Sequence, residues 1–210
     1  MWCGGHDIWH PRFAEKLLSA FKNNDIILSY PQSCEMNMEG VIVKTFNDEC
    51  TTTHINSSVK RYLHVLWKIS FNMGSLWYGI WSTNALRNCD LFKTIFSDDI
   101  LLAQASLIGK FKKYDEVLFF QRINRKKEGY RQGIIRQVVA ANGGITVEKI
   151  STFSAVMAFI AKSIQVVFNR KYHLNIFSKY WMIVNIYAVF LIRLCIMPMV
   201  NITLRKLRLK

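Results

Sequence analysis

The sequence predicts an α/β fold that is followed by hydrophobic helices. Two kinds of segment indicate this class. Short apolar runs rich in β-branched residues, typical of strands, occur at 26–30 and 41–43, whereas the apolar residues of 59–69 and 100–108 recur at helical spacing. A hydrophobic content of 51% in 210 residues is ample for a core. We therefore expect one domain, or one domain with a small appendage.

The charge and the cysteines restrict the partners and the compartment. A net charge of +14 favours an anionic partner: nucleic acid, a phospholipid surface or a phosphorylated substrate. Nucleic acid is the weakest of the three, because Phe119, Phe120 and Tyr130 form no interleaved stacking platform and no nucleic-acid motif occurs. The five cysteines include no Cys-x-x-Cys pair, which favours free thiols in a reducing compartment.

The chain is predicted to begin with a helix and to continue with two strands. Residues 1–7 lack the basic region and the apolar run of a secretory signal. A helix follows, with Pro11 near its first turn and an apolar face formed by Phe13, Leu17, Leu18 and Phe21. The run 26–30 is then expected to form a strand that ends at Pro31, and 41–43 a second strand.

A polar loop and a further helix are predicted next. Residues 48–58 are polar and irregular, and His54 among them is expected to be solvated because no second metal ligand is spaced with it. Residues 59–69 have a helical pattern that places Tyr62, Leu66 and Ile69 on one side and Arg61 elsewhere.

The centre of the sequence is the acidic pair Asp98-Asp99. It precedes an apolar series at helical spacing that Gly109 stops, so both carboxylates lie in the first turn of a helix. The helix dipole favours negative charge there, and the pair is either a simple cap or a catalytic base at the rim of a cleft. Upstream, glycines bracket two aromatics in a composition suited to a ligand-binding loop: Gly74, Trp77, Tyr78 and Gly79.

This order of features resembles the acceptor half of inverting glycosyltransferases of the family-2 type. A glycine-bracketed aromatic loop, an acidic pair, a Leu-rich helix closed by glycine and the aromatic-ended strand 114–120 carry the resemblance. It implies a partial glycosyltransferase-A-like fold with a mixed sheet and flanking helices. It also implies sugar transfer, with inversion, from a nucleotide-sugar donor to a hydroxyl of a saccharide or lipid-linked acceptor. Asp98 would be the general base beside Asp99, and the aromatic loop would bind the acceptor.

The segment Gly4-Gly5-His6-Asp7-Ile8-Trp9-His10-Pro11 resembles the metal-motif region of the same family. The resemblance implies that Asp7 and His6 hold a divalent ion, Mg²⁺ or Mn²⁺, at the sugar-nucleotide diphosphate. It covers about residues 4–136 and lacks the nucleotide-binding half, so we expect a fragment or a shortened product. A catalytically inactive membrane-surface binding module that keeps the acceptor-half fold is the alternative function.

A run of basic residues follows the last predicted strand. Three interpretations stay open: a solvated helix face or loop, a membrane-binding patch, or, as the resemblance implies, contacts to the donor diphosphate. The run contains Arg122, Arg125, Lys126, Lys127, Arg131 and Arg136. For the diphosphate we expect Arg122, Arg125 and Arg131 to matter most.

The composition changes after residue 140, and we divide the chain there into 1–140 and a hydrophobic helical tail, 141–210. Residues 153–168 have a helical apolar pattern. Residues 180–200 carry one charge, Arg193, and are long enough to span a bilayer, to lie in its interface or to form a buried helix. Basic residues on both flanks favour association with the anionic cytoplasmic face of a membrane.

Overall fold

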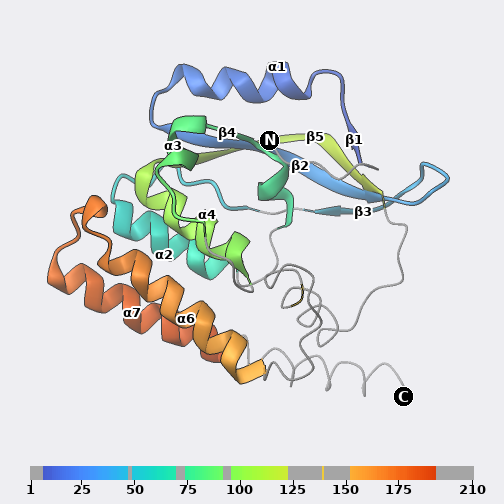
Figure 1. The fold of residues 1–210 in the computed structure, drawn as a ribbon. Helices are drawn as coiled ribbons and strands as arrows, with labels where there is room; N and C mark the ends of the chain where they lie inside the picture. The colour runs from blue at the N-terminus through green and yellow to red at the C-terminus, as the bar shows by residue number, and fades with distance from the viewer. Residues whose placement is uncertain are drawn as a thin grey trace.

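The structure is a computed structural model, and it describes residues 7–46, 49–69, 74–91, 96–122, 139 and 152–192. These residues form an α/β fold in layers (Figure 1). Helix α1 (Phe13–Leu18) and the 3₁₀ helix η1 (Ser19–Lys22) cover one face of the sheet. Helices α2 (Ser58–Ile69) and α4 (Ser97–Ile108) cover the other face, and α6 (Thr152–Phe168) and α7 (Ile176–Leu191) lie outside them.

Among the described residues the sheet has five strands, and it is mixed, as expected. The order of the strands across the sheet is β1 (Ile8–Trp9), β5 (Lys110–Arg122), β2 (Ile26–Met36) and β3 (Ile42–Phe46). Strand β4 (Ile80–Trp81) also pairs with β2. Strands β2 and β5 are parallel, whereas β1, β3 and β4 are antiparallel to their neighbours. A parallel pair needs a long crossover, which here includes α2, η2 (Gly74–Tyr78), α3 (Thr83–Arg87) and α4.

The prediction that the first long strand ends at Pro31 is wrong, because β2 continues through Pro31 to Met36. On one side of β2, β4 pairs at Leu28 and Ser29 and β3 pairs only from Ser33 onward, so the missing N–H of Pro31 falls in the gap between them. On the other side the register with β5 shifts between Pro31 and Gln32. A proline is tolerated inside a sheet at such an irregularity.

The largest group of buried side chains, here called the main core, lies between the sheet and the helices on its lower face in Figure 1. Helices α6 and α7 belong to it: Phe159, Val167 and Met182 are buried together with residues of β2, α2 and α4. A smaller group, the α1 core, joins Phe13 and Leu17 to Leu118 and Phe119.

A hydrogen bond also joins helix α7 to helix α2, which covers the sheet. The indole Nε1 of Trp67 in α2 donates to Oδ1 of Asn185 in α7 over 2.8 Å. Helix α7 begins before the predicted segment 180–200, whose residues 193–200 lie outside the described part. In the ranges that the structure covers, no helix combines the length and the apolarity needed to cross a membrane.

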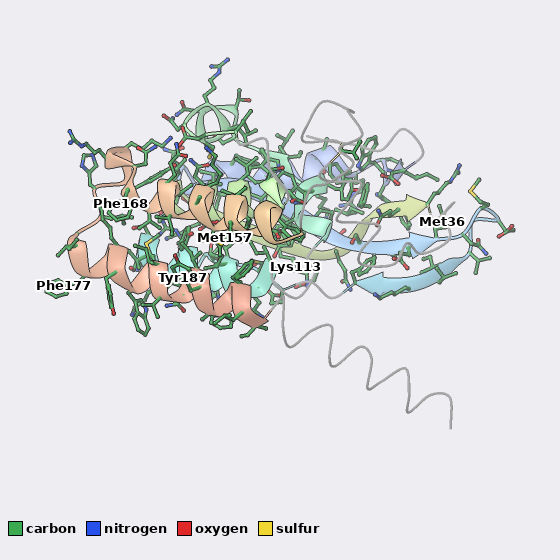
Figure 2. All side chains as sticks on the ribbon, turned by 60° about the horizontal axis from the view of Figure 1, so that its bottom comes forward. Met36, Lys113, Met157, Phe168, Phe177 and Tyr187 are labelled. Carbon is green, nitrogen blue, oxygen red and sulfur yellow. The ribbon has the colours of Figure 1, made fainter. Side chains whose placement is uncertain are left out.

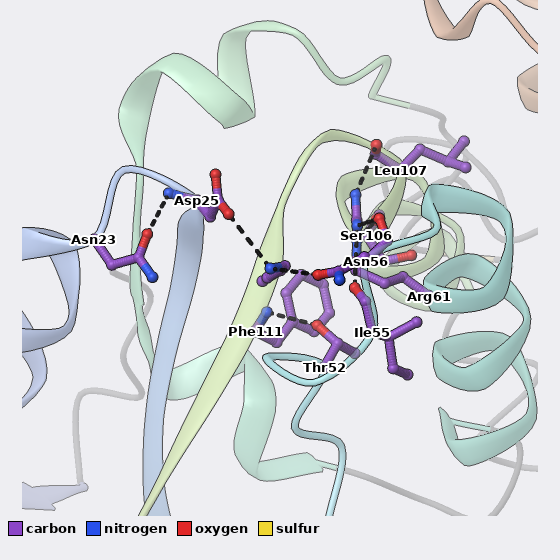
Figure 3. A network of polar contacts seen from close by, with 10 residues as sticks. Asn23, Asp25, Thr52, Ile55, Asn56, Arg61, Ser106, Leu107 and Phe111 are labelled. Atoms are coloured by element: carbon purple, nitrogen blue, oxygen red, sulfur yellow. Dashed lines mark hydrogen bonds and ion pairs between the residues drawn. The ribbon is translucent and has the colours of Figure 1, made fainter.

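Arg61 is buried, although its helical position placed it away from the apolar side of α2. Figure 3 shows its guanidinium among backbone carbonyls, with Nε 2.8 Å from Ser106 O and Nη1 2.7 Å from Asn56 O. The nearby Lys110 bridges Asp25 and Asn56, and Thr52 pairs with the backbone of Phe111. These contacts join α2, the end of α4 and the start of β5.

Candidate functional site

The acidic pair lies where the sequence placed it, in the first turn of α4. Asp98 is exposed and Asp99 is half-buried, whereas the following residues Ile100, Leu101 and Leu102 are buried in the main core. Burial of these apolar residues therefore fixes the position of α4, and Asp98 lies at the surface. A general base needs this accessibility.

The residue before the pair has an unusual backbone. Phe96 is the N-cap of α4 and has a φ of 52°, in the left-handed region that few non-glycine residues adopt. Its ring contacts Phe159 of α6 edge-on, with centroids 5.8 Å apart. Packing against α6 thus holds Phe96 in a conformation that costs on the order of 1 kcal/mol and sets the direction in which α4 begins.

The two aromatics of η2 point into different cores. Trp77 stacks on Trp81 with centroids 5.8 Å apart and packs against the main core. Tyr78 stacks on Phe119 with centroids 4.3 Å apart and packs against the α1 core. The two side chains that the resemblance assigns to the acceptor therefore pack against different cores.

Gly79 has a packing role at this point. A Cβ atom there would lie 2.5 Å from Ser29 O and 2.8 Å from Leu28 Cδ1, so only glycine lets η2 approach β2 this closely. Gly74 is the first residue of η2. Close contact with β2 therefore requires a glycine at position 79.

Three of the predicted site residues meet near the carboxyl end of β5. Asp7 precedes β1, whose Ile8 pairs with Phe120 of β5. The Oδ1 of Asp7 accepts a hydrogen bond from the backbone N–H of Arg122 over 3.3 Å. Burial, and then the negative charge of Asp7, raise the pKa of Tyr78 above the usual value of a phenol. Asp7, Tyr78 and Arg122, distant in sequence, therefore share one neighbourhood.

Arg122 has an unsatisfied donor in this neighbourhood. Its Nε is buried and has no hydrogen-bond partner among the residues that the structure covers. A buried unpaired donor costs about 1–3 kcal/mol, and an anion placed there would remove the cost. His6, Arg125 and Arg131 lie outside the described residues, so their predicted roles stay predictions.

The predicted metal site has one described member, Asp7. Within the described residues, no three His, Cys, Asp or Glu side chains are grouped so that they could hold a metal ion. One carboxylate that already accepts a hydrogen bond does not make a metal centre by itself. The metal at Asp7 and His6 stays a prediction.

Sequence reasoning missed a polar cluster around Asp90. Its carboxylate accepts hydrogen bonds from Gln104 of α4 over 3.1 Å, from Asn169 over 3.0 Å and from Lys171 over 3.1 Å. Gln104 is fully buried. The only sequence signal was a glutamine inside the apolar series of α4, which indicates a buried polar contact without naming its partner.

Comparison of the sequence with models of known protein families finds no match, and comparison with curated proteins finds no significant match either.

Proposed function

We propose that the chain is the acceptor-side part of an inverting glycosyltransferase of the family-2 type. The observation that carries the proposal is the meeting of Asp7, Tyr78 and Arg122 near the carboxyl end of β5. The resemblance assigned these residues to the metal region, the acceptor and the donor diphosphate, from three separate segments. Ligands of open α/β sheets bind at the carboxyl ends of the strands, which is the end that these residues share.

The proposed reaction needs a base, a nucleophile and a stabilised leaving group. Asp98 would accept the proton of the acceptor hydroxyl while its oxygen attacks the anomeric carbon of the sugar. The bond from that carbon to the nucleoside diphosphate breaks on the opposite face, which inverts the configuration. The guanidinium of Arg122, whose Nε has no described partner, would bind the leaving diphosphate and lower its energy.

The accessibility of the two carboxylates supports Asp98 as the base. Asp98 is exposed in the first turn of α4, whereas Asp99 is half-buried beside Ile100 of the main core. A half-buried carboxylate at a helix N-terminus suits a structural role. We therefore assign Asp98 to the reaction and Asp99 to its support.

The experiment is a comparison of Asp98→Asn with Asp99→Asn in the whole protein that contains this chain. Nucleoside diphosphate release is measured with a panel of nucleotide sugars and acceptors, and donor binding is measured separately. Asp98→Asn should lower transfer by about 10²–10⁴-fold with donor binding nearly unchanged, and Asp99→Asn should cost less. Asp115→Asn, at an exposed position of β5, is the matched control.

Two results would contradict the assignment. If Asp99→Asn removed transfer while Asp98→Asn did not, the base would be Asp99. If neither change affected transfer, the acidic pair would be a helix cap.

The alternative is an inactive binding module that keeps this fold at a membrane surface. The single carboxylate in the segment that resembles the metal motif favours it. A whole protein that binds saccharide acceptors but releases no nucleoside diphosphate from any donor would support this alternative.

A further inference from the structure

Helix α7 is apolar on both of its sides, although only one side is covered. Met182, Ile186 and Val189 are buried in the main core. The opposite side exposes 83% of Phe177, 70% of Tyr180 and 55% of Trp181. The exposed α7 face consists of these three residues and four more: Ile176, Val184, Tyr187 and Leu191.

This face is the largest gathering of exposed large hydrophobic side chains in the described ranges, with seven of the sixteen. Figure 2 shows Phe177 directed away from the protein at one end of α7, with Phe168 of α6 near the same end. Phe168 and Met157 of α6 are exposed as well. An ordinary surface helix is polar on its outer side, so a helix that is apolar all round indicates a second apolar neighbour.

The segment that contains the face carries charges of one sign. Residues 152–192 contain four lysines and arginines and no aspartate or glutamate, and Glu148 is the last acidic residue of the sequence. The four are Lys162, Arg170, Lys171 and Lys179. The sequence of 193–210 adds five more basic residues and no acidic one.

The described cations have different roles in this region. Lys171 is ion-paired with Asp90 over 3.1 Å, which ties the α6–α7 turn to the rest of the protein. Lys179 lies 5.5 Å above the ring of exposed Phe168, at the boundary between α6 and α7. Arg170 is exposed in the turn itself. Arg170 and Lys179 therefore flank the apolar face at one end.

We propose that the exposed α7 face binds the interface of an anionic lipid bilayer, with the helix lying in the plane of the surface. Tryptophan and tyrosine are suited to the boundary between headgroups and acyl chains, and flanking lysine and arginine attract anionic headgroups. The stripe from Phe177 to Leu191 is about 20 Å long, at about 1.5 Å per residue. That length presents several aromatic and aliphatic side chains to the bilayer at once.

A second copy of the chain is a poorer occupant. A two-fold contact would place the same surface of each copy against the other. Because residues 152–192 contain no acidic residue, the cations that flank each face would find no carboxylate on the partner's segment. An anionic surface supplies the opposite charge that residues 152–192 lack.

The test is flotation of the chain of residues 1–210 with phosphatidylcholine vesicles, with and without phosphatidylserine, at about 0.1 M and about 1 M salt. The Debye length falls from about 10 Å to about 3 Å over this range, so purely electrostatic binding is lost while apolar burial persists. We expect binding to the anionic vesicles at both salt concentrations. The triple variant Phe177→Ser, Tyr180→Ser, Trp181→Ser should bind at least about tenfold more weakly at high salt.

A matched triple variant on another exposed apolar segment is the control. Val41, Ile42 and Val43 at β3 are 52–58% exposed, and their change to serine should leave vesicle binding unchanged. Because Phe177 is 83% exposed, the single variant Phe177→Glu provides a second measurement that does not depend on the triple variant folding. It should also weaken binding at high salt.

Two results would overturn the proposal. The first is equal vesicle binding by the wild type and by both α7 variants. The second is a wild-type dimer that does not bind vesicles and that Phe177→Glu converts to a monomer, since the face would then join two copies. Vesicle binding does not depend on sugar transfer, so this test is independent of the proposed function.

Discussion

The Nε of Arg61 in α2 donates a hydrogen bond to the carbonyl of Ser106, in the last turn of α4, over 2.8 Å. The same guanidinium reaches Leu107 O over 3.4 Å and Asn56 O over 2.7 Å. The last carbonyls of a helix have no donor within the helix, and its dipole favours a cation at that end. One buried arginine therefore joins α2 to the end of the helix that begins with the acidic pair.

Arg61→Met should lower the free energy of unfolding by about 2–4 kcal/mol, because it leaves buried carbonyls without their donor. Urea unfolding followed by circular dichroism measures the change. The neighbouring Lys60 is exposed, and Lys60→Met should stay within about 0.5 kcal/mol of the wild type. Equal effects of the two variants would contradict the structural role of Arg61.

Gly79→Ala should destabilise the protein by about 1–3 kcal/mol, because the added Cβ would meet the backbone oxygen of Ser29 at 2.5 Å. The control is Gly40→Asn. Gly40 has a φ of 84° and open space around it, and asparagine tolerates the left-handed region. Thermal unfolding should show a lower melting temperature for Gly79→Ala than for Gly40→Asn.

Asp90→Ala should destabilise the protein by about 1–3 kcal/mol, because Gln104, Asn169 and Lys171 all lose an acceptor and Gln104 is buried. Hydrogen exchange should then increase in α6 and α7, which the cluster ties to α4. Glu15→Ala removes an exposed carboxylate that lies 3.8 Å from Arg12, and its effect should be small. An equal effect of both variants would show that the Asp90 cluster does not hold these helices.

Stability should decrease as the pH falls below about 6.5, and His64 should contribute to the decrease. Burial is the main cause that lowers the pKa of His64, with Lys68 and His54 adding to it. The unfolded chain therefore binds a proton at a higher pH than the folded protein does, and acid favours unfolding. Urea unfolding across this range should show a smaller pH dependence for His64→Phe than for the wild type. Identical pH dependence would show that His64 is not involved.

The helical spacing of apolar residues predicted helices that bury one side along their length. The apolar series after Asp99 and the stop at Gly109 indicated α4, and 153–168 indicated α6, each to within a few residues. Gly109 ends α4 for a reason that local sequence does not contain. Its backbone is extended, and a Cβ would collide with Ile27 and lie 2.9 Å from Asp25 O.

The sequence predicts that Trp77 and Tyr78 belong to an acceptor-binding loop, but it does not indicate the direction of each ring. Neighbouring residues in a 3₁₀ turn point in different directions, and which core each one enters depends on the path of β2 and β5 past the turn. Trp77 stacks on Trp81 and packs against the main core, whereas Tyr78 stacks on Phe119 and packs against the α1 core.

The sequence by itself determined the α/β class, the positions of α2, α4 and α6 and the acidic pair at the start of α4, because these follow from local periodicity within a dozen residues. Only the tertiary structure decided that β2 continues past Pro31, that Arg61 is buried against α4, and that Asp7 and Arg122 meet. Each of these features depends on a partner more than forty residues away along the chain. A local sequence pattern does not indicate which distant backbone group will need a hydrogen-bond partner in the folded protein.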